Sequence, residues 1–283
     1  MKTRELMTRS LAGGEAQARA ALAARRKDRT RGVEWGSAGV LIAEGDSWFD
    51  YPRRDIIDVL EDLHGYDVNK VAQAGDTVEE MAYQPGQLED FIRAVEKVIA
   101  RGRVPRAILL SAGGNDIAGD RFEELLNHSA APNRGLNLEM VHEFLDVRIK
   151  AAYVHILSAI TTVCEDQLGH PVPVLTHSYD YAVADGRGCL GKGPWLEPGF
   201  RAKAYFDMAE RREILVTLID RFHDMMVSVG KVRGLGHVHH VDLRTQLPND
   251  PKTFKRWWEN ELHPTQKGFK AVGEAFARTL AAL

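Results

Sequence analysis

Two residues far apart in the chain carry the side chains of a nucleophile and of its base. Ser47 lies in the motif GDSW at 45–48, directly after a short apolar run, and His263 lies in HPT at 263–265. A serine hydroxyl is a weak nucleophile until a neighbouring imidazole accepts its proton. If the fold brings them together, we expect Ser47 to attack an electrophilic carbon while His263 acts as general base.

Attack on an acyl carbon leaves negative charge on the carbonyl oxygen, and fixed N–H donors stabilise that charge. Two further turns carry suitable donors, AGDT at 74–77 and GGND at 113–116. The backbone amides of Ser47 and Gly75 and the side-chain amide of Asn115 form the predicted oxyanion hole. Glycine at position 75 also lets the backbone approach a substrate closely, because no Cβ stands in the way.

From residue 36 onward, apolar runs of strand length alternate with segments of helical periodicity. The strands and helices that they predict must position these turns. We expect five strands, over Gly39–Ala43, Asp67–Ala72, Arg106–Ser111, Val172–Thr176 and His237–Leu243. We expect the main helices over 56–63, 87–100, 138–168, 205–229 and 265–280, and a long loop over 179–199. Strands separated by helices pair in parallel, which predicts an α/β protein, a three-layer α/β/α sandwich with a parallel sheet of about five strands. Loops at the carboxyl ends of such strands meet on one rim.

In the chain the four motifs follow one another as GDSW, AGDT, GGND and HPT. In this order they resemble the sequence blocks of the SGNH/GDSL hydrolases, and the resemblance spans roughly residues 38 to 280. It implies a flavodoxin-like sheet, Ser47 as nucleophile, His263 as base and an oxyanion hole from Ser47, Gly75 and Asn115. It also implies hydrolysis of an ester or thioester through an acyl-enzyme, with no cofactor and no metal. The serine is not in a G-x-S-x-G turn, which argues against an ordinary α/β-hydrolase.

One position departs from the family pattern, which usually has Asp three residues before the histidine, whereas this chain has Asn260. A carboxylate there holds the imidazole in the productive tautomer, and replacing it by Asn in one well-studied triad lowered turnover about 10⁴-fold. Three interpretations are open. Asn260 orients His263 through its amide oxygen, or Glu259 or Glu261 takes the role of the carboxylate, or the site is weakened and serves binding.

The resemblance therefore predicts an enzyme for a small-molecule acyl ester or an acetylated substrate. A carbohydrate O-deacetylase of the same family is one alternative. A binding protein that kept the fold and lost turnover through Asn260 is another, although such a protein has no physical need for both Ser47 and His263.

Three side chains near the motifs are candidates for the substrate pocket, namely Trp48, Trp257 and His177. Trp48 either lines an acyl pocket or packs beneath the strand end. Of Trp257 and Trp258, we expect one to face the substrate and the other to lie in the core, because an indole buries a large area. His177 and Asp180 either shape the pocket or cap a turn.

The histidines at 237, 239 and 240 suggest a metal site, but their spacing argues against one. In a strand His237 and His239 share one face and His240 points to the other. No carboxylate or cysteine is spaced to complete a zinc ligand set. We therefore expect no metal here.

The chain has 283 residues, 44% of them hydrophobic and 27% charged, and a formal net charge of −3. This charge gives no reason to expect binding to nucleic acid. The two cysteines have no paired spacing, and no run of about 18 apolar residues predicts a membrane span. We therefore expect a cytoplasmic protein.

The first 35 residues are rich in Ala and Arg. We expect a polar, basic extension over 1–35, helical or flexible, and a hydrolase-type domain over 36–283. The extension is a candidate contact for forming an oligomer, and a solvated leader without a partner is the alternative.

Overall fold

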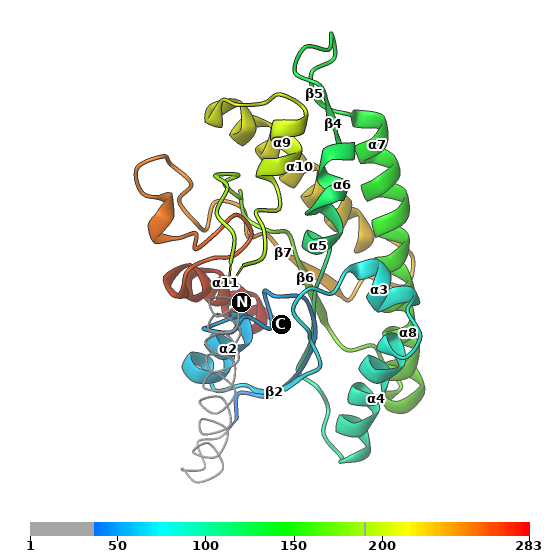
Figure 1. Cartoon of the computed structure of the whole chain (residues 1–283). Coiled ribbons are helices and arrows are strands. Elements are labelled where there is room, and N and C mark those ends of the chain that lie inside the picture. Colours follow the sequence, from blue (N-terminus) through cyan, green and yellow to red (C-terminus); the bar gives the residue numbers. More distant parts are fainter. Residues whose placement is uncertain (1–36, 190) are drawn as a thin grey trace, which may run out of the picture. The chain divides into compact units, whose positions relative to one another are not determined.

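The computed structural model describes residues 37–189 and 191–283, except for the side chain of Asp120 (Figure 1). The predicted N-terminal extension, residues 1–35, lies outside the described residues. The part from Ala38 to Leu283 forms one unit.

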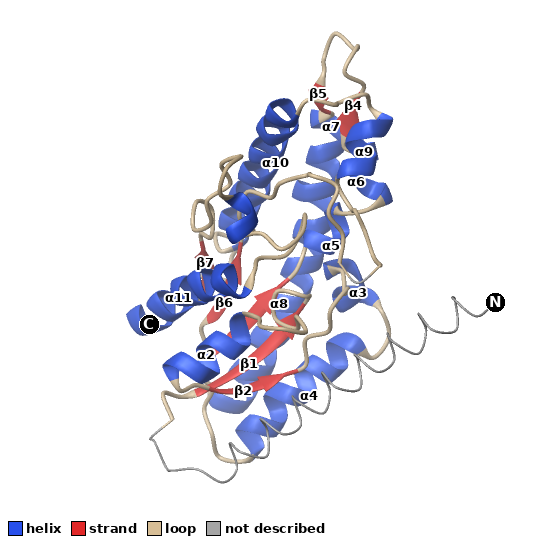
Figure 2. Cartoon of the chain, turned by 60° about the vertical axis from the view of Figure 1, so that its left-hand side comes forward, coloured by secondary structure: helices blue, strands red, loops and turns tan. Residues whose placement is uncertain are grey.

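A five-stranded sheet with strand order β2-β1-β3-β6-β7 lies at the centre of this unit (Figure 2). The strands are β1 (Val40–Gly45), β2 (Asp67–Lys70), β3 (Ala107–Ser111), β6 (Val174–His177) and β7 (Val238–Val241). Every neighbouring pair in this sheet is parallel. This strand order is the flavodoxin-like one, so the predicted fold class is confirmed.

Helices cover both faces of the sheet and give the sandwich its three layers (Figures 1 and 2). On one face α2 packs against α11, and on the other α8 packs against α3, α4 and α10. The bounds are α2 (Ile56–His64), α3 (Val78–Tyr83), α4 (Gln87–Ala100), α8 (Lys150–Leu168), α10 (Met208–Val229) and α11 (Gln266–Ala282). Because both faces are covered, every residue of β1 and β3 is buried, which explains why these strands read as continuous apolar runs.

The helix predicted over 138–168 is one continuous helical stretch with a widened segment near its start. It consists of α7 (Leu138–His142), a π-helical segment (Glu143–Ile149) and α8. Among the described residues, this stretch alone is long and apolar enough to cross a membrane, and 44% of its most apolar window is buried in protein. The core helix of a globular domain can have the same length and composition, and polar residues interrupt this stretch, so it contains no uninterrupted apolar run.

Several short elements were not predicted, because they are too short to show a periodicity. They are α3, α5 (Gly114–Ile117), α6 (Asp120–Glu124), α9 (Glu197–Ala202), the strand pair β4 (Leu126–Asn127) and β5 (Gly135–Leu136), and a 3₁₀ turn (Phe254–Arg256). α9 occupies the end of the predicted loop over 179–199.

The contact between α2 and α11 depends on a glycine. A Cβ at Gly273 would lie 2.6 Å from Cγ1 of Val59, which is fully buried. Gly273 therefore lets the two helices approach more closely than any other residue would. The position of α11 matters for the site because His263 lies in the loop that leads directly into this helix.

We expect Gly273→Ala to lower the free energy of unfolding by about 1–3 kcal/mol, because the added methyl group overpacks a full interface. This sign is opposite to the gain that Ala usually gives over Gly within a helix. Urea denaturation of Gly273→Ala, Val59→Ala and the double variant measures the effect. If the clash is the cause, the double variant loses less free energy of unfolding than the two single variants lose together. Additive losses would contradict this explanation.

Candidate active site

The fold brings Ser47 and His263 together, although 216 positions separate them, with Ser47 Oγ and His263 Nε2 2.7 Å apart. Ser47 lies in the turn after β1, and His263 lies in the loop before α11. Both side chains are largely buried, with exposed fractions of 9% and 7%. This is the geometry of a hydroxyl that can pass its proton to an imidazole.

The turn that presents Ser47 is fixed from below by Asp46. Its carboxylate accepts hydrogen bonds from the backbone N–H of Trp48 at 2.9 Å and from Ser111 Oγ at 2.7 Å, and the Tyr179 hydroxyl also donates to it. Burial raises the pKa of Asp46 to about 6. Asp46 therefore fixes the Ser47 turn from below rather than facing the imidazole of His263.

The orientation of the Asn260 side chain follows from its hydrogen bonds. Its Oδ1 atom lies 2.9 Å from the backbone N of His263 and 3.0 Å from that of Leu262. Because a backbone N–H can only donate, the atom facing these groups must be the amide oxygen.

The same oxygen determines the tautomer of His263. It lies 2.9 Å from His263 Nδ1, and because it can only accept, Nδ1 must carry the hydrogen. In the neutral ring Nε2 is then unprotonated and can accept the proton of Ser47. The tautomer lost when Asp is replaced by Asn in other triads is therefore maintained here by geometry.

Tyr51, which was not predicted as a site residue, accepts a hydrogen bond from the amide nitrogen of Asn260. Nδ2 of Asn260 lies 3.2 Å from the Tyr51 hydroxyl, which also lies 3.2 Å from Cys189 Sγ. The Tyr51 ring stacks on the His263 ring, with centroids 4.5 Å apart. An aromatic residue four positions after the nucleophile was the only sequence signal for this contact.

Neither glutamate beside Asn260 reaches the imidazole of His263. Glu259 pairs with Arg53 at 2.8 Å. Glu261 is fully buried, and its carboxylate accepts hydrogen bonds from the backbone N–H groups of Gly186, Trp195, Leu196 and Glu197. The interpretation in which Glu259 or Glu261 replaces the family's Asp is therefore wrong.

Burial lowers the pKa of His263 to about 4, and no carboxylate of the described residues opposes this shift. The imidazole is consequently neutral near pH 7. A neutral ring is the form that accepts a proton from serine, so the base is ready across a wide pH range.

Two of the three predicted oxyanion residues, Gly75 and Asn115, lie in glycine-bearing turns, and the third, Ser47, lies in the turn after β1. Gly75 has a positive φ of 104°, a conformation that glycine adopts without strain. The Asn115 side-chain amide donates to the carbonyl of Asp76 at 2.9 Å, which leaves its second N–H free to face a substrate. Among the described residues, the backbone N–H groups of Ser47 and Gly75 have no acceptor.

The GGND turn needs both of its glycines. A Cβ at Gly113, whose φ is 97°, would lie 2.6 Å from the Phe222 ring, and a Cβ at Gly114 would lie 2.8 Å from Tyr179. The last residue of the turn, Asp116, accepts the backbone N–H of Val78 at 2.8 Å and so caps α3. Burial raises its pKa to about 6. Asp116 therefore has a structural role, tying the GGND turn to the start of α3.

A cavity of about 50 Å³ opens beside Ser47 and Asn115. Most of its wall is apolar, contributed by α5, α10, the loop over 179–196 and the loop before α11. The lining residues are Asp46, Ser47, Trp48, Gly114, Asn115, Ile117, Tyr179, Asp180, Ala182, Leu196, Leu215, Leu218, Ile219, Trp258 and Leu262. Gly75 and His263 are not among them.

Trp48 has both of the roles that the sequence left open. It lines the cavity, yet it is only 2% exposed, and its Nε1–H donates to the carbonyl of Leu262 at 3.0 Å. Trp258 also lines the cavity, whereas Trp257 does not and instead packs beneath Lys267, whose Nζ lies 3.9 Å from the ring centroid. The prediction of Trp257 as a pocket residue is wrong, because the turn of the chain directs its neighbour to the cavity.

His177 is not a pocket residue either. It is fully buried, its Nε2 lies 2.7 Å from Ser111 Oγ, and its ring stacks on Trp48 from below. As the last residue of β6 it points into the molecule, and burial lowers its pKa to about 4. Asp180 caps a turn, accepting the backbone N–H of Thr245 at 2.8 Å and that of Leu247.

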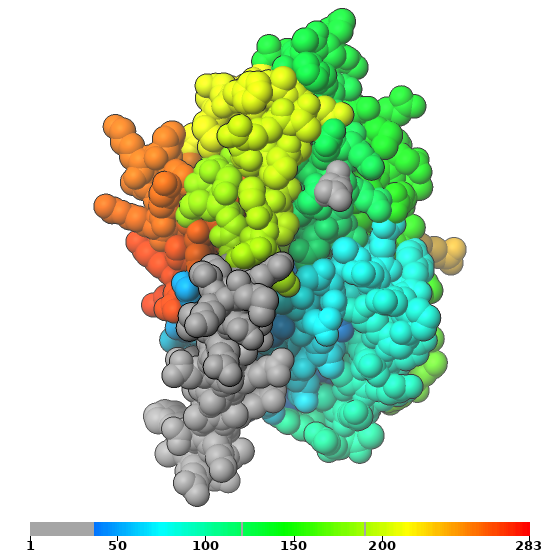
Figure 3. Space-filling model, viewed as in Figure 1, coloured from blue at the N-terminus to red at the C-terminus, as the bar shows by residue number. Residues whose placement is uncertain are grey.

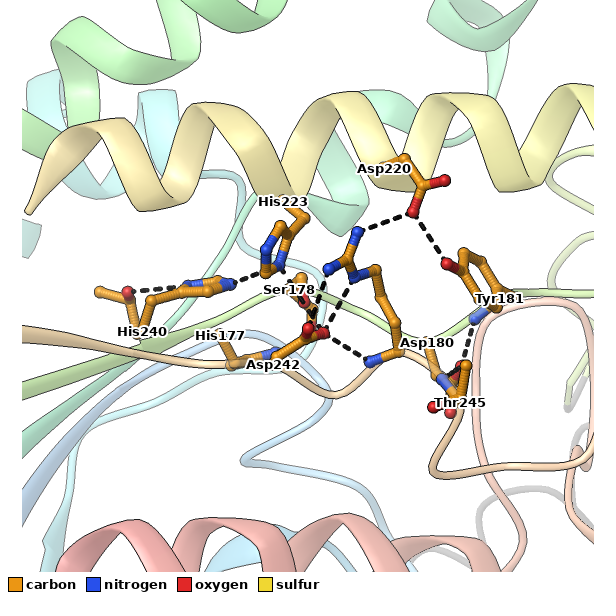
Figure 4. A network of polar contacts seen from close by, with 11 residues as sticks. His177, Ser178, Asp180, Tyr181, Asp220, His223, His240, Asp242 and Thr245 are labelled. Carbon is orange, nitrogen blue, oxygen red and sulfur yellow. Dashed lines mark hydrogen bonds and ion pairs between the residues drawn. The ribbon is translucent and has the colours of Figure 1, made fainter.

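The histidines near β7 take part in a polar network with α10 (Figure 4). His240 Nε2 lies 3.1 Å from His223 Nδ1, and Asp242 pairs with Arg244. His237 instead contacts Thr161 Oγ1 at 2.9 Å. Within the described ranges, no group of three or more His, Cys, Asp or Glu side chains is arranged to hold a metal ion.

The loop over 179–196 is tied to the loop that carries His263. Arg187 donates to the carbonyls of Trp258 and Glu259 at 2.9 and 2.8 Å, and Glu261 binds the same loop through the backbone contacts described above. In Figure 3 this loop (yellow-green) lies beside the orange segment that includes these residues. The two loops therefore form one wall over the site.

No protein-family model matches this chain, and no curated protein matches it in sequence. Solved structures do resemble it. A candidate arylesterase from Agrobacterium tumefaciens aligns with a TM-score of 0.51 at 15% identity, over 86% of this chain and 99% of that one. The acetylxylan esterase Axe2 from Geobacillus stearothermophilus aligns with a TM-score of 0.47 at 16% identity, over 88% and 96%. A member of the lipolytic G-D-S-L family from Veillonella parvula gives 0.46 at 12% identity, over 86% and 99%.

At these identities the likeness is one of fold. The chain shares its fold with the candidate arylesterase, and its sheet order is the flavodoxin-like one that the resemblance to SGNH/GDSL hydrolases implies.

The partner of the His263 imidazole is the uncharged amide of Asn260, which does not stabilise the protonated ring as a carboxylate would. We expect the imidazole to titrate with a midpoint near 4, and Asn260→Asp to raise this pKa by about 1–3 units, because a carboxylate stabilises the imidazolium. NMR titration of the ring measures both values. Asn133→Asp, which adds the same charge at an exposed position, serves as the control. A titration midpoint above 6 in the wild type would contradict this account, and so would an unchanged midpoint in Asn260→Asp.

Proposed function

We propose that the chain is a serine hydrolase that cleaves an ester or thioester through an acyl-enzyme on Ser47. The observation that carries this proposal is the continuous hydrogen-bond chain from Ser47 Oγ through His263 to Asn260 Oδ1. In it the Ser47 hydroxyl donates to His263 Nε2, and His263 Nδ1–H donates to Asn260 Oδ1, which is the direction that proton transfer from the serine requires. Neither a cofactor nor nucleic acid enters this chemistry, and the substrate is a small-molecule acyl ester.

In the first half-reaction, the Ser47 oxygen attacks the carbonyl carbon while its proton passes to His263 Nε2. The resulting oxyanion accepts hydrogen bonds from the backbone N–H groups of Ser47 and Gly75 and from the free N–H of Asn115. His263 then gives the proton to the leaving alcohol or thiol, and the carbon–oxygen or carbon–sulfur bond breaks.

In the second half-reaction, water replaces the leaving group. His263 takes a proton from the water molecule as its oxygen attacks the acyl carbon, and then returns that proton to Ser47 Oγ. The products are a free carboxylic acid and the regenerated enzyme. Asn260 accepts the Nδ1–H of His263 in every step, so the ring cannot turn away.

The alternative in which Asn260 leaves only a binding site is less well supported. A weakened triad would allow the imidazole to turn or to adopt the other tautomer, whereas three donors hold the Asn260 oxygen in place. Asn260 offers a dipole rather than a charge to the imidazolium. We therefore expect an active site with a smaller electrostatic contribution from the third residue than an Asp would give.

A fluorophosphonate probe tests for an activated serine. We expect the wild type to be labelled, and Ser47→Ala and His263→Ala to lose labelling, because the first lacks the nucleophile and the second its base. Ser158→Ala, at an exposed position on α8, should be labelled like the wild type. A folded wild type that resists labelling would sink the proposal and leave the binding-protein alternative in its place.

Removing the third residue tests the orienting role of Asn260. We expect Asn260→Ala to lower the labelling rate by about 10²–10⁴-fold, less than loss of either partner, because the imidazole loses its fixed tautomer. Asn133→Ala is the matched control. An unchanged labelling rate in Asn260→Ala would show that Asn260 does not position the base.

A further inference from the structure

We propose that the cavity beside Ser47 binds the acyl group of the substrate, that this group is a hydrocarbon chain of about three to five carbons, and that Ile219 on α10 limits its length. This inference rests on the function proposed above and goes beyond it by naming the substrate class. It also decides against the carbohydrate O-deacetylase alternative, whose acyl group is a single acetyl.

The polar atoms in the cavity wall are almost all engaged by the protein itself. Asp46 is bound by Trp48, Ser111 and Tyr179. Asp180 accepts from the backbone N–H groups of Tyr181, Thr245 and Leu247. The Tyr179 hydroxyl accepts the backbone N–H of Gly114.

What remains for a ligand in this wall is the Ser47 hydroxyl, the Asn115 amide, the buried Nε1–H of Trp258, which has no partner among the described residues, and hydrocarbon. A sugar ring placed there would lose its hydrogen bonds to water without replacement, which costs free energy for each hydroxyl group. An alkyl chain gains from the same surface. The chemistry of the wall therefore selects an apolar group.

The position of His263 shows which side of the ester enters the cavity. The general acid must stand beside the leaving oxygen, so the leaving group lies on the His263 side of Ser47. The cavity wall contains Ser47 and Asn115 but not His263. The part of the substrate that enters it is therefore the acyl group, and the alcohol or thiol lies outside.

The size of the cavity sets the length of the chain. A water-sized group needs roughly 10–15 Å³ of such space. The cavity of about 50 Å³ therefore holds about three to five groups of that size. An acetyl group would leave much of it empty, and an octanoyl chain would not fit.

The wall formed by α10 is well placed to stop the chain. Leu215, Leu218 and Ile219 lie three and four positions apart, on one face of the helix, and all three line the cavity. The helix cannot easily withdraw, because buried Arg211 binds the carbonyls of Tyr205 and Ala184 at 2.8 and 3.0 Å.

Asp220, next to Ile219, holds the opposite wall in place. It accepts hydrogen bonds from the Tyr181 hydroxyl and from Arg244, each at 2.8 Å (Figure 4). Tyr181 belongs to the loop that contributes Ala182 to the cavity. The α10 wall and the loop wall are thus locked to each other, so the length limit is built into the fold.

A panel of p-nitrophenyl esters from acetate to dodecanoate tests the inference on the intact protein. We expect kcat/KM of the wild type to peak at butanoate or pentanoate, about tenfold or more above acetate, because each buried methylene strengthens transition-state binding. Octanoate should fall about tenfold or more below the peak, because the chain meets α10.

Two matched variants then test Ile219. Ile219→Ala should move the peak to hexanoate or a longer ester, whereas Ile214→Ala should keep the wild-type peak. Both are buried isoleucines on α10, with exposed fractions of 7% and 8%, but only Ile219 lines the cavity. Ile219→Val makes the same change in a smaller step if the alanine variant does not fold.

The outcomes separate this inference from the proposed function. Esterase activity with a preference for acetate, or the same peak in the Ile219 and Ile214 variants, would overturn the acyl cavity and leave the serine hydrolase standing. Labelling by the fluorophosphonate without hydrolysis of any ester in the panel would do the same. Absence of both labelling and hydrolysis would overturn both proposals.

Discussion

The site depends on a single oxygen atom, Oδ1 of Asn260, and on the three N–H groups that point at it. Two of them are backbone groups of Leu262 and His263, and the third is Nδ1 of the His263 ring. The backbone pair fixes the shape of the loop, and the same contacts decide which amide atom faces the imidazole. Loop geometry and ring tautomer are therefore one constraint rather than two. Loss of it would free both the base and the segment that enters α11.

The chemistry that follows differs from that of a triad with a carboxylate. Asn260 is fully buried, where an ionised side chain would need compensation for its lost solvation. A neutral amide avoids that cost, and Tyr51 completes its hydrogen bonding. The imidazole in turn has no negative charge beside it, so its pKa falls through burial alone. The arrangement keeps the imidazole of His263 unprotonated to low pH, and an amide stabilises an imidazolium less than a carboxylate would.

The sequence predicted the sheet because β1 and β3 are buried on both faces and read as apolar runs, and it predicted the rim because the motifs follow these strands. It did not decide the role of Asn260, because the amide orientation depends on Tyr51 and on backbone donors that only the folded loop supplies. The predictions for His177 and Trp257 failed for a related reason. Which side chain faces a cavity depends on how a strand or turn is rotated, and spacing alone does not determine this rotation.

Buried carboxylates around the site share one task. Asp46, Asp116, Asp180 and Glu261 all accept backbone N–H groups from turns and loops near the rim. A buried carboxylate requires such donors, and a turn with unpaired N–H groups requires an acceptor, so each stabilises the other. Asp46 and Asp180 are the two of these acids that line the cavity, and because their hydrogen bonds are taken up by the fold they add little polarity to it. The region is therefore rigid and hydrogen-bonded on the protein side and apolar on the side that faces a ligand. This division is the structural basis of the proposal that a hydrocarbon chain binds beside Ser47.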